Sequence, residues 1–281
     1  TYARIGTLRP PGCPLMALTA TAPAPLRAQI VASLCLAPSH GVIVGALRRP
    51  NLRYEVREKR TDALHDLLPI LREERGTTIV YVPKTSEADE LAAKLRAEGL
   101  RAGAFHGSLT SSQKLSALSA FLMDELHVVV ATLAFGMGVD KSDVRCVINY
   151  GPPASLEAYS QQSGRAGRDG APARCILCHA PSDWSRLQYL AANEPNASRR
   201  DAAVRLAGAI KAYAHSGACR HEEMLRYLGS AEEDKANDSA ASSRGCGGMC
   251  DICERAGGER ASDLSREARL LIQAVKACGG Y

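Results

Sequence analysis

The sequence lacks any apolar run long enough to cross a membrane. The longest, such as those at 41–47 and 128–132, fall far short of the ~18 residues that a spanning helix needs. It also lacks a basic, apolar, small-residue opening, so we expect no secretory signal. Without export, its ten cysteines are not expected to form a disulfide framework.

A strong excess of one charge is missing too. The chain has 35 Lys+Arg against 30 Asp+Glu, and the net charge of +5 permits a polyanionic partner without requiring one. Apolar residues make up 46% of the 281 residues and charged residues 23%, which excludes a disordered or fibrous chain. This length favours about two domains.

Short apolar runs alternate with helical patterns from about 15 to 182, an order typical of a doubly wound α/β domain with a parallel sheet. Most runs are continuous, as expected for strands buried on both faces. Strands are predicted at 41–45, 77–82, 101–105, 127–132, 146–150 and 173–178, with helices at 61–74, 85–98, 111–124 and 155–163. Beyond 182 only helices are predicted, at 183–193, 198–216, 221–228 and 263–277, with a polar surface insertion at 231–245.

A glycine-rich run at 159–170 contains Arg165 and Arg168, preceded by Gln161. The spacing puts both guanidinium groups on one side of a short helix or turn. Arginine suits such a place because its charged fork matches phosphate oxygens, and it can stabilise the charge of a γ-phosphate in transfer. The alternative is a solvated basic turn.

The segment after the strand predicted at 127–132 is a candidate ligand site, because ligands bind at strand ends in open α/β sheets. Thr132 can hold a nucleic-acid phosphate, and glycines including Gly138 allow close backbone approach. The alternative is a plain turn with an exposed Asp140. His106, after another predicted strand, is either functional or a solvated loop residue.

Four cysteines form the second candidate site. Cys219 opens a predicted helix, and Cys246, Cys250 and Cys253 follow in a glycine-containing loop. Such a set can converge on one ion, and four cysteines are a preferred shell for structural zinc, which would supply folding energy to a small helical module. The alternative is a set of unliganded thiols. His221 is not needed as a ligand, since four cysteines fill the shell.

A haem-attachment pattern, C-x-x-C-H, occurs at Cys175, Cys178 and His179. It falls in a predicted buried strand, where side chains three positions apart point to opposite faces and cannot both bond to one haem. We therefore reject haem binding there.

The run QQSGRAGRDG at 161–170 resembles motif VI of superfamily 2 helicases, in the form typical of the RecQ family. Gln162 departs from the family, which more often has Glu there. Other segments are similar to family motifs in the same order: ALTATA at 17–22 (motif III), RPNLR at 49–53 (the hinge into the second RecA-like domain), TIVYV at 78–82 (motif IV), FHGSL at 105–109 and VATLAFGMGVD at 130–140 (motif V). CRHEEMLRYLG at 219–229, with the clustered cysteines, resembles the family's zinc-binding subdomain.

The resemblance implies an ATP-dependent 3′–5′ DNA helicase active in repair or recombination, placed in the nucleus, or in the cytoplasm if the source is bacterial. It implies structural Zn²⁺, with ATP and Mg²⁺ bound mainly by a preceding motor half, and DNA with a single-stranded tail and duplex junction as partner. The implied catalytic residues are Arg165, Arg168 and Gln161, and ATP would contact Gly138, Asp140 and the arginines. The implied DNA contacts are Thr132, His106, Thr19 and Thr21.

No G-x-x-x-x-G-K-[ST] phosphate loop and no Asp-Glu-x-His run occurs in this sequence. We therefore expect a fragment that is inactive when isolated. Its expected parts are the end of a first RecA-like domain (1–47), a second RecA-like domain (48–182), a helical zinc-binding subdomain (183–258) and the start of a winged-helix domain (259–281). Two alternatives stay open: another superfamily 2 enzyme such as an RNA helicase, or a non-motor adaptor that binds nucleic acid.

Overall fold

The computed structural model describes residues 5–10, 13–19, 24–36, 41–43, 48–60, 62–136, 139–229 and 245–258. Helices α1 (Ile5–Leu8) and α2 (Ala24–Ser33) precede the first strand. The strands are β1 (Leu52–Glu58), β2 (Thr77–Tyr81), β3 (Ala102–Phe105), β4 (Val128–Ala131), β5 (Val144–Tyr150) and β6 (Ala173–His179). Between them lie α3 (Ala63–Glu73), α4 (Thr85–Ala97), α5 (Ser111–Leu122) and α6 (Leu156–Ser163), and after them α7 (Pro181–Ala192), α8 (Ala197–His215), α9 (Arg220–Leu228) and α11 (Asp251–Gly258).

The strands form one six-stranded sheet in the order β1-β6-β5-β2-β4-β3, with every neighbouring pair parallel. Every residue of β2 and β4 is buried, as their continuous apolar runs predict for inner strands. The predicted doubly wound parallel sheet is therefore confirmed.

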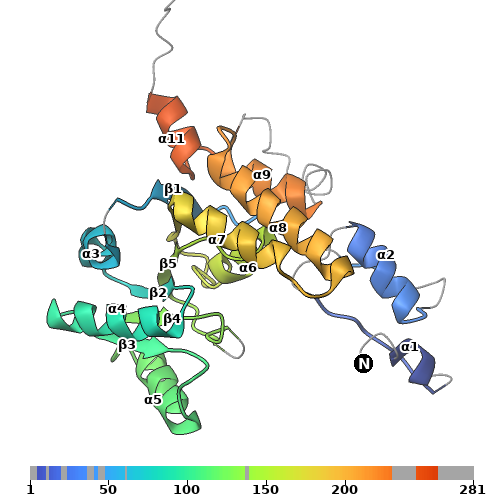
Figure 1. Ribbon diagram of the computed structural model, residues 1–281, viewed down its shortest axis with the longest axis horizontal. Helices are drawn as coiled ribbons and strands as arrows, with labels where there is room; N and C mark the ends of the chain where they lie inside the picture. The colour runs from blue at the N-terminus through green and yellow to red at the C-terminus, as the bar shows by residue number, and fades with distance from the viewer. Residues whose placement is uncertain are drawn as a thin grey trace, which may run out of the picture.

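Helices cover both faces of the sheet (Figure 1). On one face, Leu67 of α3 and Leu91 of α4 pack with residues from β2, β4 and β5. On the other face, α5, α6, α8 and α9 contribute large side chains, among them Phe121, Tyr159 and Tyr213. Two apolar cores thus fix the sheet from both sides.

One expected strand is wrong and one real strand was not predicted. Residues 41–43, the described part of the expected strand at 41–45, are exposed and have no regular structure. Instead β1 pairs in parallel with β6 over its full length and closes the sheet at that edge. Its sequence, LRYEVRE, alternates charged and apolar residues and so does not resemble a strand buried on both faces.

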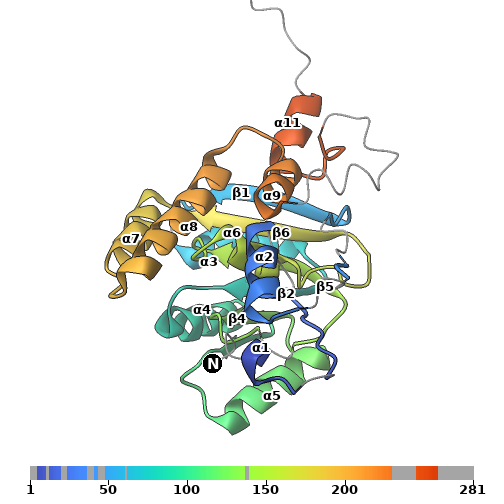
Figure 2. The same cartoon turned by 90° about the vertical axis from the view of Figure 1, so that its right-hand side faces the viewer.

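Beyond β6 the described chain is helical apart from its loops, as predicted. Figure 2 shows α9 and α11 beside β1, the edge strand. Of the expected insertion at 231–245 only Gly245 is among the described residues, and the expected helix at 263–277 lies outside them. Among the described helices, none is long and apolar enough to span a membrane.

Candidate functional site

The two arginines of the glycine-rich run lie in the turns that follow α6. Ser155 caps this helix by accepting a hydrogen bond from the amide of Ala158 at 3.1 Å. The helix ends at Ser163, and the chain then turns through Gly167, whose φ of +55° favours glycine. The short helix therefore delivers Arg165 and Arg168 on a turn.

Arg168 reaches the segment that follows β4. Its Nη1 donates to Oδ1 of Asp140 at 2.8 Å and to the carbonyl of Val139 at 3.1 Å. Asp140 is largely exposed, so the ion pair itself adds little stability, but it fixes the direction of the guanidinium. The structure thus brings together two residues that are 28 positions apart in the sequence.

Arg165 points toward the same segment. A Cβ added at Gly136 would lie 3.1 Å from Nη2 of Arg165, so the glycine allows this close approach. Burial raises the pKa of the nearby Tyr81 to about 12, and the charge of Arg165 opposes that rise. Arg165 Nε is buried and has no hydrogen-bond partner among the described residues.

Thr132 and His106 follow the ends of the neighbouring strands β4 and β3. Thr132 is half-buried, and its amide donates to the carbonyl of Phe105 at 3.1 Å. His106 is 4% exposed and its Nε2 lies 3.0 Å from Oδ1 of Asp89, so it is not a solvated loop residue. The roles of both in DNA binding stay predictions.

The remaining predicted residues are dispersed. Gln161 is exposed on α6, whereas Gln162, the departure from the family pattern, is buried and accepts a hydrogen bond from Asn149. Thr19 is exposed well before β1. Gly138 and Thr21 lie outside the described residues.

The structure also reveals two residues that hold the turn of the arginines and that the sequence did not single out individually. Arg49 and Asn51 donate side-chain hydrogen bonds to backbone carbonyls of this turn, at Ala166, Gly167 and Ala171. Their only signal in the sequence is their place in the hinge-like segment at 49–53, just before β1.

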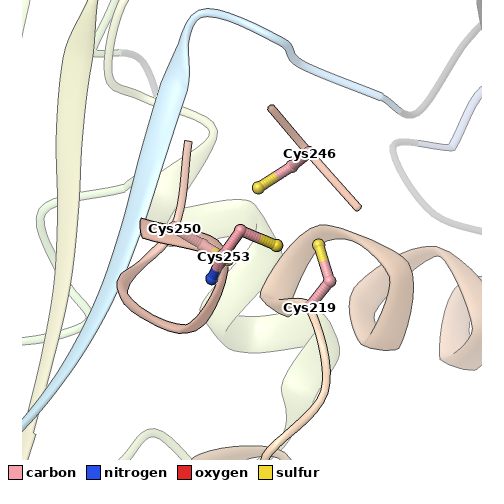
Figure 3. Close-up of side chains that lie close together, drawn as sticks. All are labelled: Cys219, Cys246, Cys250 and Cys253. Atoms are coloured by element: carbon pink, nitrogen blue, oxygen red, sulfur yellow. Dashed lines mark hydrogen bonds between the residues drawn. The ribbon is translucent and has the colours of Figure 1, made fainter. Parts of the chain in front are cut away.

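All four predicted cysteines converge (Figure 3). The Sγ atoms of Cys219, Cys246, Cys250 and Cys253 lie within 4.8 Å of one another. A tetrahedral zinc ion with Zn–S bonds of about 2.3 Å holds its sulfurs about 3.8 Å apart, close to this span. The donor set and its geometry therefore fit structural zinc.

The loop before α11 is shaped for this convergence by glycines. Gly245, Gly247 and Gly248 have φ values of +92°, +67° and +87°, a region that L side chains rarely adopt. At Gly245 an added Cβ would also lie 2.8 Å from the Sγ of Cys253. The loop can therefore bring its sulfurs together only because these positions lack a side chain.

Three thiols of the cluster differ in how readily they ionise. Burial raises the pKa of Cys219 to about 11 and raises that of Cys246 further, so these thiols ionise only with a stabilising cation. Burial opposes the ionisation of Cys250 too, but hydrogen bonds from backbone amides bring its pKa below the usual value. One of these donors is the amide of Cys253, 3.4 Å from the Sγ of Cys250.

Buried polar residues fasten the cysteine module, defined here as Cys219 with α9, the loop 245–250 and α11. Arg220 binds Asp251 at 2.9 and 3.2 Å and also donates to the carbonyl of Tyr213. His221 directs Nε2 at the carbonyls of Leu52 and Met249, at 3.0 and 3.1 Å, and so takes no part in the thiol cluster. Through these contacts the module is joined to the start of β1.

The haem-like pattern does not form one site. Cys175 packs in the core on one face of the sheet and Cys178 in the core on the other. The expected opposite orientation of the two thiols is therefore confirmed.

The chain combines a six-stranded parallel sheet, an arginine-bearing turn and a four-cysteine helical module. This combination defines a helicase C-terminal domain joined to a zinc-binding domain. Two family models agree: residues 59–170 match "Helicase conserved C-terminal domain" and 181–254 match "RecQ zinc-binding". The chain belongs to the RecQ helicase family, of which it carries this C-terminal helicase region and the zinc-binding domain.

Curated relatives that match most of this chain are named as ATP-dependent helicases. The ATP-dependent DNA helicase RecQ of Pasteurella multocida is 36% identical, with 90% of this chain and 38% of that protein covered, and that of Haemophilus influenzae is 34% identical, with 90% and 39% covered. The mouse (Mus musculus) bifunctional 3′-5′ exonuclease/ATP-dependent helicase WRN is 34% identical over 90% of this chain and 18% of its own. The chain thus spans about two fifths of the bacterial relatives' length. Because relatives come from bacteria and eukaryotes alike, they do not support a nuclear location.

Proposed function

We propose that this chain is the second motor half and zinc module of an ATP-dependent DNA helicase that moves 3′ to 5′ and acts in repair or recombination. The observation that carries the proposal is the approach of both arginines to one segment. Arg168 binds Asp140 at 2.8 Å, and Arg165 lies against Gly136 of the same segment. Two permanent positive charges on a fixed turn suit the γ-phosphate of a nucleotide held across a domain cleft.

In this proposal ATP and Mg²⁺ bind mainly to a preceding motor half, and the arginines complete the site from the other side. Arg165 and Arg168 would stabilise the charge that spreads over the transferred phosphoryl group. Gln161 and the segment containing Gly138 would flank the nucleotide. Closure of the cleft on ATP would then draw the two halves together.

Nucleic acid would be gripped at the ends of the parallel strands. Thr132 follows β4 there, and its hydroxyl and neighbouring amides suit a phosphate contact that positions the strand without reading its sequence. His106, Thr19 and Thr21 are the further contacts of the proposal. Repeated closure would move the chain along single-stranded DNA toward a duplex junction.

Zinc would act structurally. When bound, it links the start of α9, the glycine loop and the start of α11 through Cys219, Cys246, Cys250 and Cys253, and so supplies folding energy to the module. Arg220 then joins α9 to Asp251 of α11, and His221 fastens the module to the sheet at Leu52. The match of 181–254 to the RecQ zinc-binding model disfavours an RNA helicase of the DEAD-box kind.

The test is Arg168→Ala in the complete protein. We expect DNA-stimulated ATP hydrolysis to fall by roughly 10³-fold, because an arginine at the transferred phosphate is worth that much or more, while DNA binding is kept. Arg72→Ala is the matched control, since Arg72 forms only an exposed ion pair with Glu98 at 2.9 Å. Unchanged turnover in Arg168→Ala would remove the arginine from this role, and absence of ATP hydrolysis in the unmodified protein would favour the non-motor adaptor.

A further inference from the structure

The turn that carries the two arginines is held by side chains more than a hundred residues away in the sequence. Arg49 Nη2 donates to the carbonyl of Gly167 at 2.7 Å and to that of Ala166 at 3.2 Å. Asn51 Nδ2 donates to the carbonyls of Gly167 and Ala171, both at 2.9 Å. The carbonyl of Gly167 therefore accepts hydrogen bonds from both side chains. Gly167 lies between Arg165 and Arg168 in the sequence.

The turn closes tightly over Asn51. A Cβ added at Gly167 would lie 2.5 Å from Nδ2 of Asn51 and 2.8 Å from the carbonyl oxygen of Ala171. Together with its φ of +55°, this contact restricts position 167 to glycine. The amide of Asn51 thus occupies the space that a side chain at 167 would need.

The opposite side of the turn is fixed by the start of β5. The amide of Gly167 donates to the carbonyl of Val144 at 2.9 Å, and that of Asp169 to the carbonyl of Ser142 at 3.1 Å. Arg145 also holds both carboxylate oxygens of Asp169 at 2.7 Å. The residues near β5 thus hold the turn through its amides, whereas Arg49 and Asn51 hold it through its carbonyls.

Asn51 is itself held firmly in place. Its backbone carbonyl accepts from the amide of Ala173 at 3.0 Å, at the point where β1 and β6 begin to pair. The next residue, Leu52, is fully buried, and its carbonyl faces His221 of the cysteine module. The donors that meet the turn are thus attached to the sheet and to that module.

We infer that Arg49 and Asn51 are positioning residues for the arginine pair: their hydrogen bonds to the carbonyls of 166, 167 and 171 set where Arg165 and Arg168 point. The inference rests on the proposed function of the pair. The two residues act through the backbone of the turn, whose carbonyls accept their hydrogen bonds. A displacement of about 1 Å at a reacting centre can cost about 100-fold in rate. The loss of the hydrogen bonds that hold the turn should therefore reduce turnover although both arginines keep their charge.

The experiment compares ATP hydrolysis by the complete protein and its Asn51→Ala and Asn51→Asp variants, with DNA present. We expect kcat to fall about 10- to 100-fold, with the KM for ATP within about twofold of its original value. Asn51→Asp keeps the size of the side chain but replaces the donor by an oxygen that faces two carbonyls. It should therefore be at least as impaired as Asn51→Ala. Arg49→Lys, which keeps a donor, should retain more activity than Arg49→Ala.

The matched control is Asn193→Ala. Asn193 Nδ2 also donates to a backbone carbonyl, that of Tyr189 at 2.8 Å, but at the exposed end of α7. It should leave kcat unchanged. Zinc content and DNA affinity should be the same in the Asn51 variants and this control, so that a loss of fold is not mistaken for a loss of positioning.

A double variant separates positioning from structural damage. If Asn51 acts through the arginine pair, adding Asn51→Ala to Arg168→Ala should lower kcat by much less than the Asn51→Ala change does alone. Equal fold-losses in both backgrounds, or full activity of Asn51→Ala, would overturn the inference while leaving the role of Arg168 intact. Full activity of Arg168→Ala itself would instead overturn the proposed function.

Discussion

The sheet and the cysteine module are stabilised by different means. In the sheet, β2 and β4 are wholly buried, and helices cover apolar cores on both faces. In the module, the buried positions of α9 are shared equally between the apolar Met224 and Leu228 and the polar Arg220 and His221, and two thiols are buried beside them. The sheet therefore gains its stability mainly from apolar burial, whereas the module adds a four-thiol zinc site and paired polar contacts to a few apolar residues.

This contrast shows how a small helical module can be attached to a helicase C-terminal domain. Only two residues of α9, Met224 and Leu228, are apolar and buried, and the module also joins its short helices through four thiols and fastens them to the edge strand. The amide of Tyr54 in β1 donates to the carbonyl of Met249, and Arg53 pairs with Glu254 of α11. Four changes test this contrast, and they are given in order of decreasing effect.

Cys250→Ser should remove the zinc and unfold the module while the sheet persists. Structural zinc contributes about 10–16 kcal/mol in small zinc-binding peptides, far more than a single hydrogen bond. Zinc content by atomic absorption should fall from one ion per chain to none. Hydrogen exchange should become fast in α9 and α11 but stay slow in β2 and β4.

Cys13→Ser is the control for that change, because Cys13 is exposed and far from the cluster in sequence. It should keep its zinc. If Cys250→Ser retained stoichiometric zinc, the four-cysteine site would be wrong. If β2 and β4 also exchanged quickly, the independence of the sheet would be wrong.

Arg220→Ala should destabilise the protein by about 3–5 kcal/mol, because it leaves the half-buried Asp251 without its main partner in a protected site. Urea unfolding followed by circular dichroism measures the loss. Arg226→Ala, which breaks an exposed pair with Glu223, should cost less than about 1 kcal/mol. Equal losses in the two variants would mean that the buried pair does not fasten the module.

Gly245→Ala and Gly99→Ala compare the two regions at glycines of similar φ, +92° and +82°. An added Cβ at Gly99 meets nothing within 4 Å, so that variant should lose only about 1–2 kcal/mol of conformational energy. At Gly245 the Cβ also collides with the Sγ of Cys253. Zinc affinity, measured by competition with a chelator, should therefore fall in Gly245→Ala and stay constant in Gly99→Ala; equal affinities would contradict the tight loop.

His179 should give the sheet region a shallow dependence on acid. Burial lowers its pKa, and His215 adds to this, while Glu58 and Asp183 oppose it. Because the unfolded chain takes up a proton near pH 6.5 and folded His179 resists, stability should decline as pH falls below that value. The buried ring also accepts a hydrogen bond from Trp184 Nε1 on Nδ1, which a proton would block.

Urea unfolding between pH 5 and 8 tests this dependence. The stability of His179→Gln should fall less steeply below about pH 6.5 than that of the unmodified protein. His65→Gln, at an exposed position of α3, should keep the original slope. Identical slopes in all three proteins would rule out His179 as the source.

Local sequence patterns predicted much of the fold. Continuous apolar runs such as TTIVY and VVVA predicted the inner strands, because a strand buried on both faces needs apolar side chains at every position. The pattern failed at β1, where Glu55 is buried although it is charged. Arg53, Arg57 and Arg174 surround that carboxylate at 3.2, 2.6 and 3.1 Å. Arg53 and Arg57 are neighbours in the sequence, but Arg174 is 119 positions away and has no local signal.

The residues of the candidate sites also divide into those that local sequence patterns predicted and those that they did not. The spacing of Cys246, Cys250 and Cys253 predicted a cluster, because three cysteines within eight residues of a glycine loop can reach one ion. The arginines were predicted from their glycine-rich run, which limits how that segment can turn. Nothing local indicated that His106 would be buried against Asp89, or that Arg49 and Asn51 would meet the arginine turn.

Local patterns in the amino-acid sequence were enough to predict the strands with apolar runs, the helices between them and three of the four zinc ligands, because each depends on side chains within a few positions of one another. In contrast, the closure of the sheet by β1, which places Asn51 against Gly167, 116 residues further along the chain, emerged only from the folded chain. Such contacts follow from the register between strands and the packing of the whole core. Both are settled jointly by many distant residues.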